Sequence, residues 1–170
     1  PSVIEQIAVQ YNGRVLRAKS DPADLMALAV NQRDTLGLIG STDGRFIFPW
    51  FHPAFDAMMA AAKLIDYLGS PNGRRLSELV AAVPPYHLRE AEVECAWEKK
   101  GEVMRRLTEE AAKERADFTE GVKIFFEGGW VLVTPDPRGP AFHIYVEASE
   151  SERAEAMVSQ TRERILAMAG

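Results

Sequence analysis

The sequence has a single cysteine, no excess of basic charge and no long apolar run. Because Cys95 is the only cysteine, an internal disulfide and a CxxC zinc site are both excluded. Lys and Arg number 20 against 25 Asp and Glu, which gives a formal net charge of −5. Proteins that bind nucleic acids or anionic membranes need a net basic face, so we expect neither partner.

The apolar runs are also too short for a membrane protein. None approaches the ~20 residues that a spanning helix needs, and no basic-then-apolar signal segment opens the chain. We therefore expect a soluble cytoplasmic protein.

The composition is that of an ordinary globular protein. The 170 residues are 46% hydrophobic and 26% charged, which excludes a disordered or fibrous chain. This length suits one domain or two small ones. The run Gly69-Ser70-Pro71-Asn72-Gly73 is the strongest interruption of regular structure, so we predict two domains, residues 1–70 and 71–170.

The first 70 residues alternate helix and strand patterns. Ser2 followed by Glu5 is typical of a capping box, and Asp21-Pro22 is typical of a helix start. The patterns predict helices from these two positions, a long helix over 53–68, and strands over 14–18, 35–39 and 46–48. The apolar side of the long helix consists of Phe55, Met58, Met59, Ala62 and Ile65. This alternation favours an α/β layer structure with a largely parallel sheet.

Residues 71–170 follow a different order. The patterns predict helices over 76–83 and 97–115, strands over 87–95, 122–126, 130–133 and 142–146, and a last helix opened by a Ser149–Glu152 capping box. Gly128-Gly129 is a typical two-residue hairpin connection. The helix over 97–115 would bury Trp97, Gly101, Met104, Leu107 and Ala111. We predict an α+β domain with a mainly antiparallel sheet covered by helices on one face.

Two small-residue or proline-rich loops are candidate ligand sites. In the first, Ser41, Thr42, Asp43 and Gly44 would let backbone N–H groups and hydroxyls approach a ligand; the alternative is an ordinary turn. The second, residues 134–140, is longer than a hairpin needs. Its three prolines remove N–H donors, so Arg138 would be the anion receptor; the alternative is a stiff connector.

A third candidate is the basic segment that contains Arg17 and Lys19, before the predicted helix start at Asp21. Helix N-termini in α/β sheets favour anions, but Asp21 acting only as an N-cap is the simpler explanation of the pattern. The remaining polar groups indicate less: His52, His87 and His143 show no metal-ligand spacing, and Glu90, Glu92, Glu94 and the run Glu98-Lys99-Lys100 are interpreted as solvated faces. The residue patterns by themselves therefore indicate no catalytic group and no metal ligand.

Several segments resemble one known family. Gly121–Ile124, Gly129–Val133 and Ile144–Ala148 are similar to the last domain of the phosphohexomutases, the phosphomannomutases and phosphoglucomutases. Gly40–Pro49 followed by Phe55-Asp56-Ala57 resembles the domain before it. The resemblance covers nearly the whole chain. It implies an incomplete α/β/α third domain that lacks its first strand, followed by the α+β fourth domain.

The chain departs from the family at the positions that hold the ligand. The family's phosphate loop reads R-P-S-G-T-E-P, whereas Thr134, Asp136, Pro137 and Arg138 stand here for its arginine, serine, glycine and threonine. An acidic Asp136 repels a phosphate. Ser41 replaces the sugar-binding glutamate, Phe55 replaces the arginine of R-D-G, and Lys19 is what remains of a T-K-x-G turn.

The resemblance also implies that parts of the family's machinery lie elsewhere. The phosphoserine nucleophile and the magnesium-binding D-x-D-x-D-R loop belong to the family's first two domains, and neither motif occurs here. We therefore expect a C-terminal fragment that holds no cofactor itself, with Mg²⁺ bound in the missing half. Cys95–Arg105 and the Pro-Asp-Pro loop look like a bacterial subgroup in which a mannose-1-phosphate guanylyltransferase domain comes first.

Three hypotheses follow from this resemblance. The first is a degenerate module in sugar-nucleotide metabolism of the GDP-mannose type, non-catalytic alone, whose partners are the preceding domains and a weakly bound or lost sugar phosphate. The second is part of a working phosphomannomutase that interconverts hexose 6-phosphate and hexose 1-phosphate. Arg138, His143 and Lys19 would then contact phosphate, and Ser41, Thr42 and Asp43 the sugar hydroxyls. The third is an oligomerisation or interaction module, through which the protein would form a homo-oligomer or bind another partner.

Overall fold

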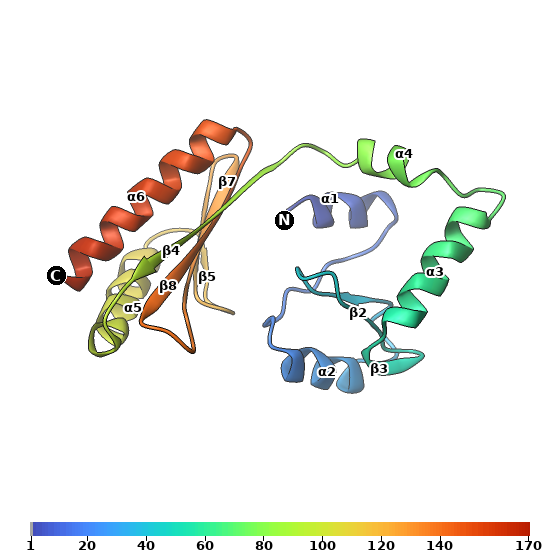
Figure 1. Ribbon diagram of the computed structural model, residues 1–170, viewed down its shortest axis with the longest axis horizontal. Coiled ribbons are helices and arrows are strands. Elements are labelled where there is room, and N and C mark those ends of the chain that lie inside the picture. The colour runs from blue at the N-terminus through green and yellow to red at the C-terminus, as the bar shows by residue number, and fades with distance from the viewer. Residues whose placement is uncertain (1) are drawn as a thin grey trace. The chain divides into compact units, whose positions relative to one another are not determined.

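The computed structural model describes residues 2–170, which form two compact units (Figure 1). One unit is Leu16–Val83, and the other combines residues 2–15 with Pro84–Gly170. The division therefore follows Val83 rather than residue 70, and the first helix belongs with the C-terminal residues. The assignment of 1–70 and 71–170 to two phosphohexomutase domains stays a prediction.

The unit 16–83 combines three helices with a small sheet. Its elements are α2 (Pro22–Asn31), β1 (Ile39–Gly40), β2 (Phe46–Phe48), β3 (His52–Phe55), α3 (Ala57–Gly69) and α4 (Leu76–Ala81). The sheet has the order β1-β2-β3, and both pairs are antiparallel. The expected largely parallel sheet is therefore wrong. The segments 41–45 and 49–51 that join these strands are too short for the crossover that parallel neighbours need.

Local capping explains a further difference in this unit. The predicted helix over 53–68 begins only at Ala57, because the Asp56 carboxylate accepts the N–H of Met59 (2.8 Å) and caps α3 there. The residues just before it form β3 instead. The strand predicted over 14–18 does not form, and the one predicted over 35–39 shrinks to β1. The predicted start of α2 is confirmed, since Asp21 accepts the N–H of Ala23 (2.8 Å).

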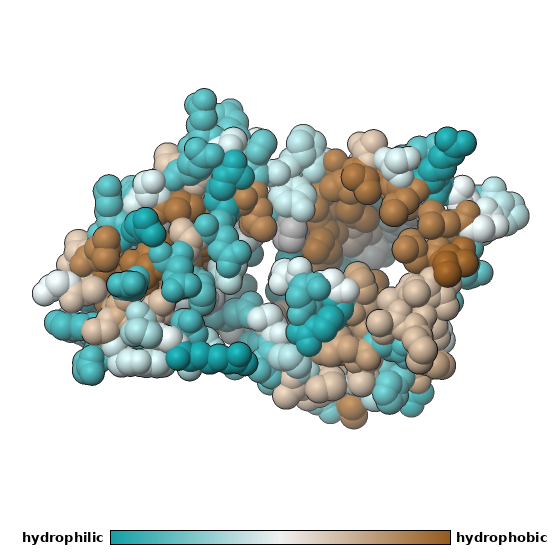
Figure 2. All heavy atoms as spheres, in the orientation of Figure 1, coloured by the Kyte–Doolittle hydropathy of each residue, from teal (hydrophilic) through white to brown (hydrophobic). Residues whose placement is uncertain are grey.

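The core of this unit is small. Leu25 and Ala29 of α2 pack with Ile39 and Ile47 of the sheet, whereas α3 and α4 bury no residue. Met58 of α3 is 84% exposed and Ile65 of the same helix is 70% exposed. Figure 2 shows hydrophobic side chains gathered over α3 and α4. Of the predicted apolar side, Phe55 packs against this core and Met59 is half-buried, whereas Met58, Ala62 and Ile65 are uncovered in this unit.

The second unit is built on a five-stranded antiparallel sheet in the order β4-β8-β7-β6-β5. Its elements are α1 (Val3–Gln10), β4 (His87–Glu94), α5 (Trp97–Ala111), β5 (Ala116–Asp117), β6 (Val122–Phe126), β7 (Gly129–Pro135), β8 (Ala141–Ala148) and α6 (Ser151–Ala169). α5 and α6 lie on the same side of this sheet (Figure 1) and share one core with it. The predicted fold class, a mixture of α and β with a mainly antiparallel second sheet, is confirmed.

The core face of α5 differs from the predicted stripe. Lys100, Val103, Leu107 and Ala111 are its buried residues, whereas Trp97 is 53% exposed. Alternate residues of β8 face the core, and Phe142, Ile144 and Val146 are completely buried. The burial of a lysine in this row is explained below by its hydrogen bonds.

Both predicted capping boxes of this unit are wrong. Glu147 of β8 is only 5% exposed, and its carboxylate accepts the N–H of Ser2 (2.9 and 3.0 Å) at the start of α1. The Ser2 hydroxyl instead accepts a hydrogen bond from Trp130 Nε1 (3.1 Å). A carboxylate at a helix N-terminus stabilises the helix through its dipole, and here β8 supplies the carboxylate that accepts the N–H of Ser2, the role that the capping box assigns to Glu5. α6 likewise starts after Glu150 without a side-chain cap.

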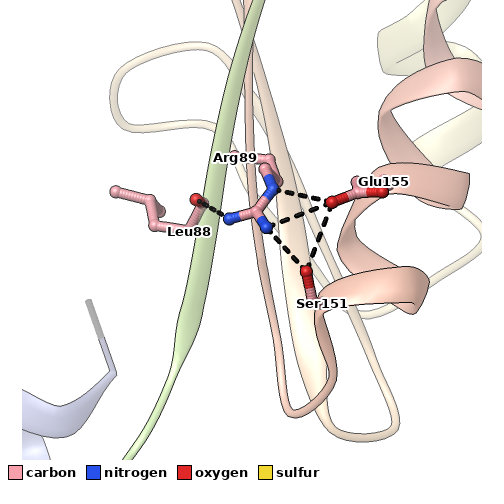
Figure 3. Close-up of polar contacts among 4 residues, drawn as sticks. All are labelled: Leu88, Arg89, Ser151 and Glu155. Carbon is pink, nitrogen blue, oxygen red and sulfur yellow. Dashed lines mark hydrogen bonds and ion pairs between the residues drawn. The ribbon is translucent and has the colours of Figure 1, made fainter.

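The edge strand β4 is tied to α6 by arginine. Arg89 donates to Ser151 Oγ (2.6 Å) and to the Glu155 carboxylate, and also to the carbonyl of Leu88 (3.0 Å; Figure 3). Arg162 of α6 donates to the carbonyl of Glu92 (2.9 Å). Arginine side chains thereby donate hydrogen bonds to two backbone carbonyls of β4, a strand that has only one neighbour in the sheet. Glu90, Glu92 and Glu94 are exposed, which confirms the predicted solvated face.

No helix within residues 2–170 combines the length and the apolar character needed to cross a membrane.

Candidate functional site

The connection between β7 and β8 is shorter than the sequence predicts. Thr134 pairs with His143 and Pro135 with Phe142, so the two strands continue past the expected end of β7. What remains is residues 136–140, named here the β7–β8 loop. The N–H of Asp136 donates to the carbonyl of Ala141 (3.0 Å) and closes the loop at its base. Short-range hydrogen bonds, and not only prolines, therefore set its shape.

The Asp136 carboxylate turns back onto its own loop. Its Oδ1 accepts the N–H of Arg138 (2.7 Å). The pKa of Asp136 is lowered, mainly because of this N–H, with smaller contributions from the N–H of Gly139 and from His143. A Cβ on Gly139 would lie 3.0 Å from Asp136 Oδ2, so the absence of a side chain there lets the carboxylate approach. The loop therefore already binds one anionic group, its own.

His143 lies beside this carboxylate on β8. Its Nε2 is 3.4 Å from Asp136 Oδ2, and its Nδ1 is 4.0 Å from Glu92 Oε2. The imidazole is 26% exposed and its ring stands 6.3 Å from that of Tyr145. A protonated His143 would pair with both carboxylates, whereas a neutral one would lose most of that attraction. The predicted group of Asp136 and His143 is thus brought together.

Lys100 supports the β7–β8 loop from beneath, and sequence reasoning missed it. The residue is 7% exposed. Its Nζ donates to the carbonyl of Asp136 and to that of Gly139 (2.8 Å), and it lies 4.2 Å from the centre of the Trp97 ring. The run Glu98-Lys99-Lys100 suggested a solvated face. The available indication was helical spacing, because Lys100 precedes the buried Val103 and Leu107 by three and seven positions.

Arg138 points its charge outward. Its side chain is exposed, and it pairs with no carboxylate in the part of the chain that the structure describes. That Arg138 receives an external anion stays a prediction. Thr134, the other predicted member, is half-buried on β7.

The turn between β1 and β2 is satisfied by its own groups. The N–H of Ser41 donates to the carbonyl of Arg45 (2.9 Å), and the N–H of Gly44 donates to that of Ser41 (3.1 Å). Gly44 has φ 81°, a conformation that glycine adopts without strain. Arg45 Nε donates to Asp43 Oδ2 (2.6 Å), and this hydrogen bond lowers the pKa of Asp43 to about 2. Thr42 is exposed at the tip.

The other candidates are dispersed. Arg17 and Lys19 lie exposed in a segment without regular structure, and Asp21 is an N-cap, the simpler of the two alternatives. The predicted sugar-loop residues belong to the unit 16–83, whereas the predicted phosphate-loop residues belong to the other unit. Within residues 2–170, no three His, Cys, Asp or Glu side chains gather as metal ligands. That Mg²⁺ binds outside this segment stays a prediction.

A groove of about 600 Å³ lies beside the β7–β8 loop. It is lined by Glu92, Glu94, Cys95, Ala96, Gly139, Pro140, Ala141, Leu166, Ala169 and Gly170. Cys95 is buried here, and burial raises the pKa of its thiol. A protonated thiol is a poor nucleophile, which agrees with the interpretation of Cys95 as a packed side chain.

Comparison with curated proteins finds similar sequences among sugar-phosphate mutases. The chain is 36% identical over 156 residues to a "probable phosphoglucosamine mutase" of Methanopyrus kandleri, a match that covers 89% of the chain and 33% of the relative. It is 28% identical over 155 residues to a phosphoglucomutase/phosphomannomutase of Thermococcus kodakarensis, covering 90% and 33%. The chain thus spans about a third of the length of these relatives. No profile of a known protein family matches it.

A solved structure shows the same fold. The crystal structure of a phosphoglucomutase/phosphomannomutase family protein from Burkholderia thailandensis matches 97% of the chain and 35% of its own length, with a TM-score of 0.74 and 18% identity. By sequence and by fold, the chain is similar to the C-terminal part of proteins of this superfamily, as predicted. The narrower resemblance to a guanylyltransferase-fused bacterial subgroup stays a prediction, since the two curated relatives named above are archaeal.

Proposed function

We propose that this chain is the C-terminal part of a phosphohexomutase-type protein, that it contacts a sugar phosphate only weakly, and that it is non-catalytic by itself. The similarity along nearly all of the chain supports the first element of this proposal. The chemistry of the β7–β8 loop supports the second. The absence of the phosphoserine and D-x-D-x-D-R motifs from the sequence supports the third.

The observation that carries the proposal is the Asp136 carboxylate. It accepts the N–H of Arg138, and the N–H of Gly139 also contributes to its lowered pKa. Pro137 and Pro140 have no N–H, so these two groups and the N–H of Asp136, which is bonded to Ala141, are the only backbone donors of the loop. An incoming phosphate must displace the carboxylate or do without these donors.

Two charges remain for a weakly bound phosphate. Arg138 has an exposed guanidinium, and His143 becomes cationic when it is protonated. Because Asp136 stands 3.4 Å from His143, part of that positive charge is already neutralised within the protein. We therefore expect phosphate affinity to be low and to depend on Asp136.

The wider setting is also part of the proposal. The whole protein would supply Mg²⁺ and phosphoserine from its other domains, would act in the cytoplasm, and would serve sugar-nucleotide metabolism of the GDP-mannose type beside a mannose-1-phosphate guanylyltransferase domain. A sequence of the complete reading frame tests this setting directly. Eroded phosphoserine and D-x-D-x-D-R motifs support a non-catalytic module, whereas an intact pair supports the alternative below.

The alternative is an active phosphomannomutase, and one observation favours it. The free guanidinium of Arg138 could hold a phosphoryl group of a substrate when the missing domains complete the site. In that case Asp136 would move away from its loop when substrate binds. The third hypothesis, an oligomerisation module, is favoured by the uncovered apolar side of α3.

The test is a titration of the 170-residue chain with inorganic phosphate and glucose 1-phosphate, followed by amide NMR. Asp136→Ser should bind phosphate about tenfold more tightly than the wild type, because a hydrogen bond to a charged group is worth about 1.5–3 kcal/mol. Asp117→Ser is the matched control, since the Asp117 carboxylate also accepts an N–H two residues on, from Thr119 (2.8 Å), but outside the loop.

Two results would contradict the proposal. One is a wild type that binds phosphate as tightly as Asp136→Ser, with shifts at the Arg138 and Gly139 amides. The other is conversion of glucose 1-phosphate to glucose 6-phosphate by the 170-residue chain alone.

A further inference from the structure

The most unusual group in the second unit is the buried ammonium of Lys100. Lysine is almost never fully buried unless it is paired, yet Lys100 is only 7% exposed. No carboxylate of residues 2–170 forms an ion pair with it. Neutral groups therefore offset the loss of its hydration, and the identity of those groups indicates what Lys100 does in the fold.

The acceptors of Lys100 are the two carbonyls that precede prolines. Asp136 O and Gly139 O belong to the peptide groups before Pro137 and Pro140, which carry no N–H. The Trp97 ring, 4.2 Å from Nζ, provides a further favourable contact through its π face. A single ammonium thus holds both ends of the β7–β8 loop.

The other polar groups of the loop complete the arrangement. The carbonyl of Pro140 accepts the N–H of Cys95 (2.7 Å), at the start of the turn that leads into α5. The N–H of Arg138 donates to the Asp136 carboxylate, and the N–H of Gly139 helps to lower the pKa of the same carboxylate. The loop therefore commits the carbonyls of Asp136, Gly139 and Pro140 to the body of the unit and the N–H of Arg138 to an anionic group.

We infer that Lys100 is a positioning residue of the β7–β8 loop, which fixes the Asp136 and Gly139 carbonyls so that the N–H groups of Arg138 and Gly139 face an anion. In the wild type that anion is the Asp136 carboxylate. The inference rests on the proposed function where it gives this loop a role toward phosphate. Lys100 itself contacts no ligand.

The test compares Lys100→Met with Lys99→Met in the 170-residue chain. Lys99 is the adjacent lysine and is exposed, so its replacement removes the same charge without touching the loop. Amide hydrogen exchange at Arg138 and Gly139 should become at least tenfold faster in Lys100→Met and should be unchanged in Lys99→Met. Amides of β7 and β8, such as that of Ile144, should exchange as in the wild type.

A second readout separates positioning from support of the fold. In the Asp136→Ser background, adding Lys100→Met should reduce phosphate affinity at least tenfold, although the circular dichroism spectrum stays that of the parent. If Lys100→Met does not fold, NMR of the wild-type chain tests the inference. The Lys100 ammonium should then give a slowly exchanging ¹⁵N signal that is coupled across its hydrogen bonds to the two carbonyls. A rapidly exchanging, uncoupled ammonium would overturn the inference, as would unchanged exchange at Arg138 and Gly139.

The two proposals fail in different ways. If Asp136→Ser gains no phosphate affinity, the proposed function is wrong, but the exchange of the Arg138 amide still reports on Lys100. If Asp136→Ser binds phosphate and Lys100→Met changes neither the exchange nor the affinity, only the positioning role is wrong.

Discussion

At the scale of single residues, the two acidic side chains of the candidate loops are both occupied, but in different ways. Asp43 is paired with a cation, Arg45, within the β1–β2 turn. Asp136 is held chiefly by backbone N–H groups within the β7–β8 loop. An arginine partner leaves the turn nearly neutral, whereas backbone partners leave the charge of Asp136 facing any incoming phosphate. Under the proposed function, this difference makes Asp136 the residue on which phosphate affinity should depend.

The pairing of Asp43 predicts a pH dependence of stability. Its folded pKa is about 2, below the ordinary value of 3.8, so its stabilising contribution is complete above pH 3.8 and is lost as the pH falls toward 2. Asp43→Asn should therefore show a shallower loss of unfolding free energy between pH 4 and pH 2 than the wild type. Urea unfolding at a series of pH values measures this slope.

Arg45→Gln provides the control for that experiment. It keeps Asp43 but removes the partner that lowers its pKa, so its acid limb should resemble that of Asp43→Asn. If both variants lose stability as steeply as the wild type, the pairing of Asp43 contributes nothing in solution.

At the scale of elements, hydrophobic alternation made part of the second unit predictable. The hairpin between β6 and β7 was expected, but its two-residue turn is Glu127-Gly128 rather than Gly128-Gly129, because Phe126 pairs with Gly129 and Gly128 takes the positive φ of 81°. β8 alternates apolar and polar residues, β7 is a short continuous apolar run after a glycine, and the antiparallel sheet expected for β6, β7 and β8 was confirmed. The parallel sheet expected in the first unit was wrong because strands as short as Ile39–Gly40 have little pattern of their own. Turn lengths and the capping of α3 by Asp56 decide that region, and neither is visible in hydrophobic periodicity.

The candidate site was predictable only where sequence neighbours define it. Asp136 and Arg138 lie two positions apart and were identified, whereas Lys100 lies 36 positions from its acceptor Asp136. Its contacts depend on α5 lying next to the β7–β8 loop in the folded chain, and no local sequence pattern contains that proximity. His143 was identified through the resemblance to the phosphohexomutase loop, and its contact with Glu92 depends on the register of β4 against β8.

The hairpin of β6 and β7 supports a prediction at this scale. A Cβ on Gly129 would collide with the carbonyl oxygen of Glu147, whereas a Cβ on Gly101 of α5 would meet nothing within 4 Å. Gly129→Ala should lower the unfolding free energy by about 1–3 kcal/mol through this overpacking. Gly101→Ala should raise it by about 0.5–1 kcal/mol, because alanine is the better helix former.

Thermal or urea unfolding of both variants measures these changes. The same substitution thus has opposite expected signs at two sites of one unit. Equal effects at Gly101 and Gly129 would contradict the described packing of β7 against β8.

At the scale of the whole molecule, the two units differ in how completely they bury their apolar side chains. The second unit has a continuous core of sheet and helices, whereas α3 and α4 of the first bury nothing. The chain spans about a third of its relatives, so the activity of the whole protein is a matter of proposal. What these 170 residues can test is the chemistry of their own loop.

The most direct test of the central claim, that Asp136 serves the β7–β8 loop as an internal anion, is an NMR pH titration of the wild-type chain. We expect the Asp136 carboxyl carbon and the Arg138 amide proton to titrate together, with one midpoint below the ordinary aspartate pKa of 3.8. Asp136→Asn should abolish the step at Arg138. An Arg138 amide that is insensitive to the protonation of Asp136, or an Asp136 midpoint at or above 3.8, would contradict it.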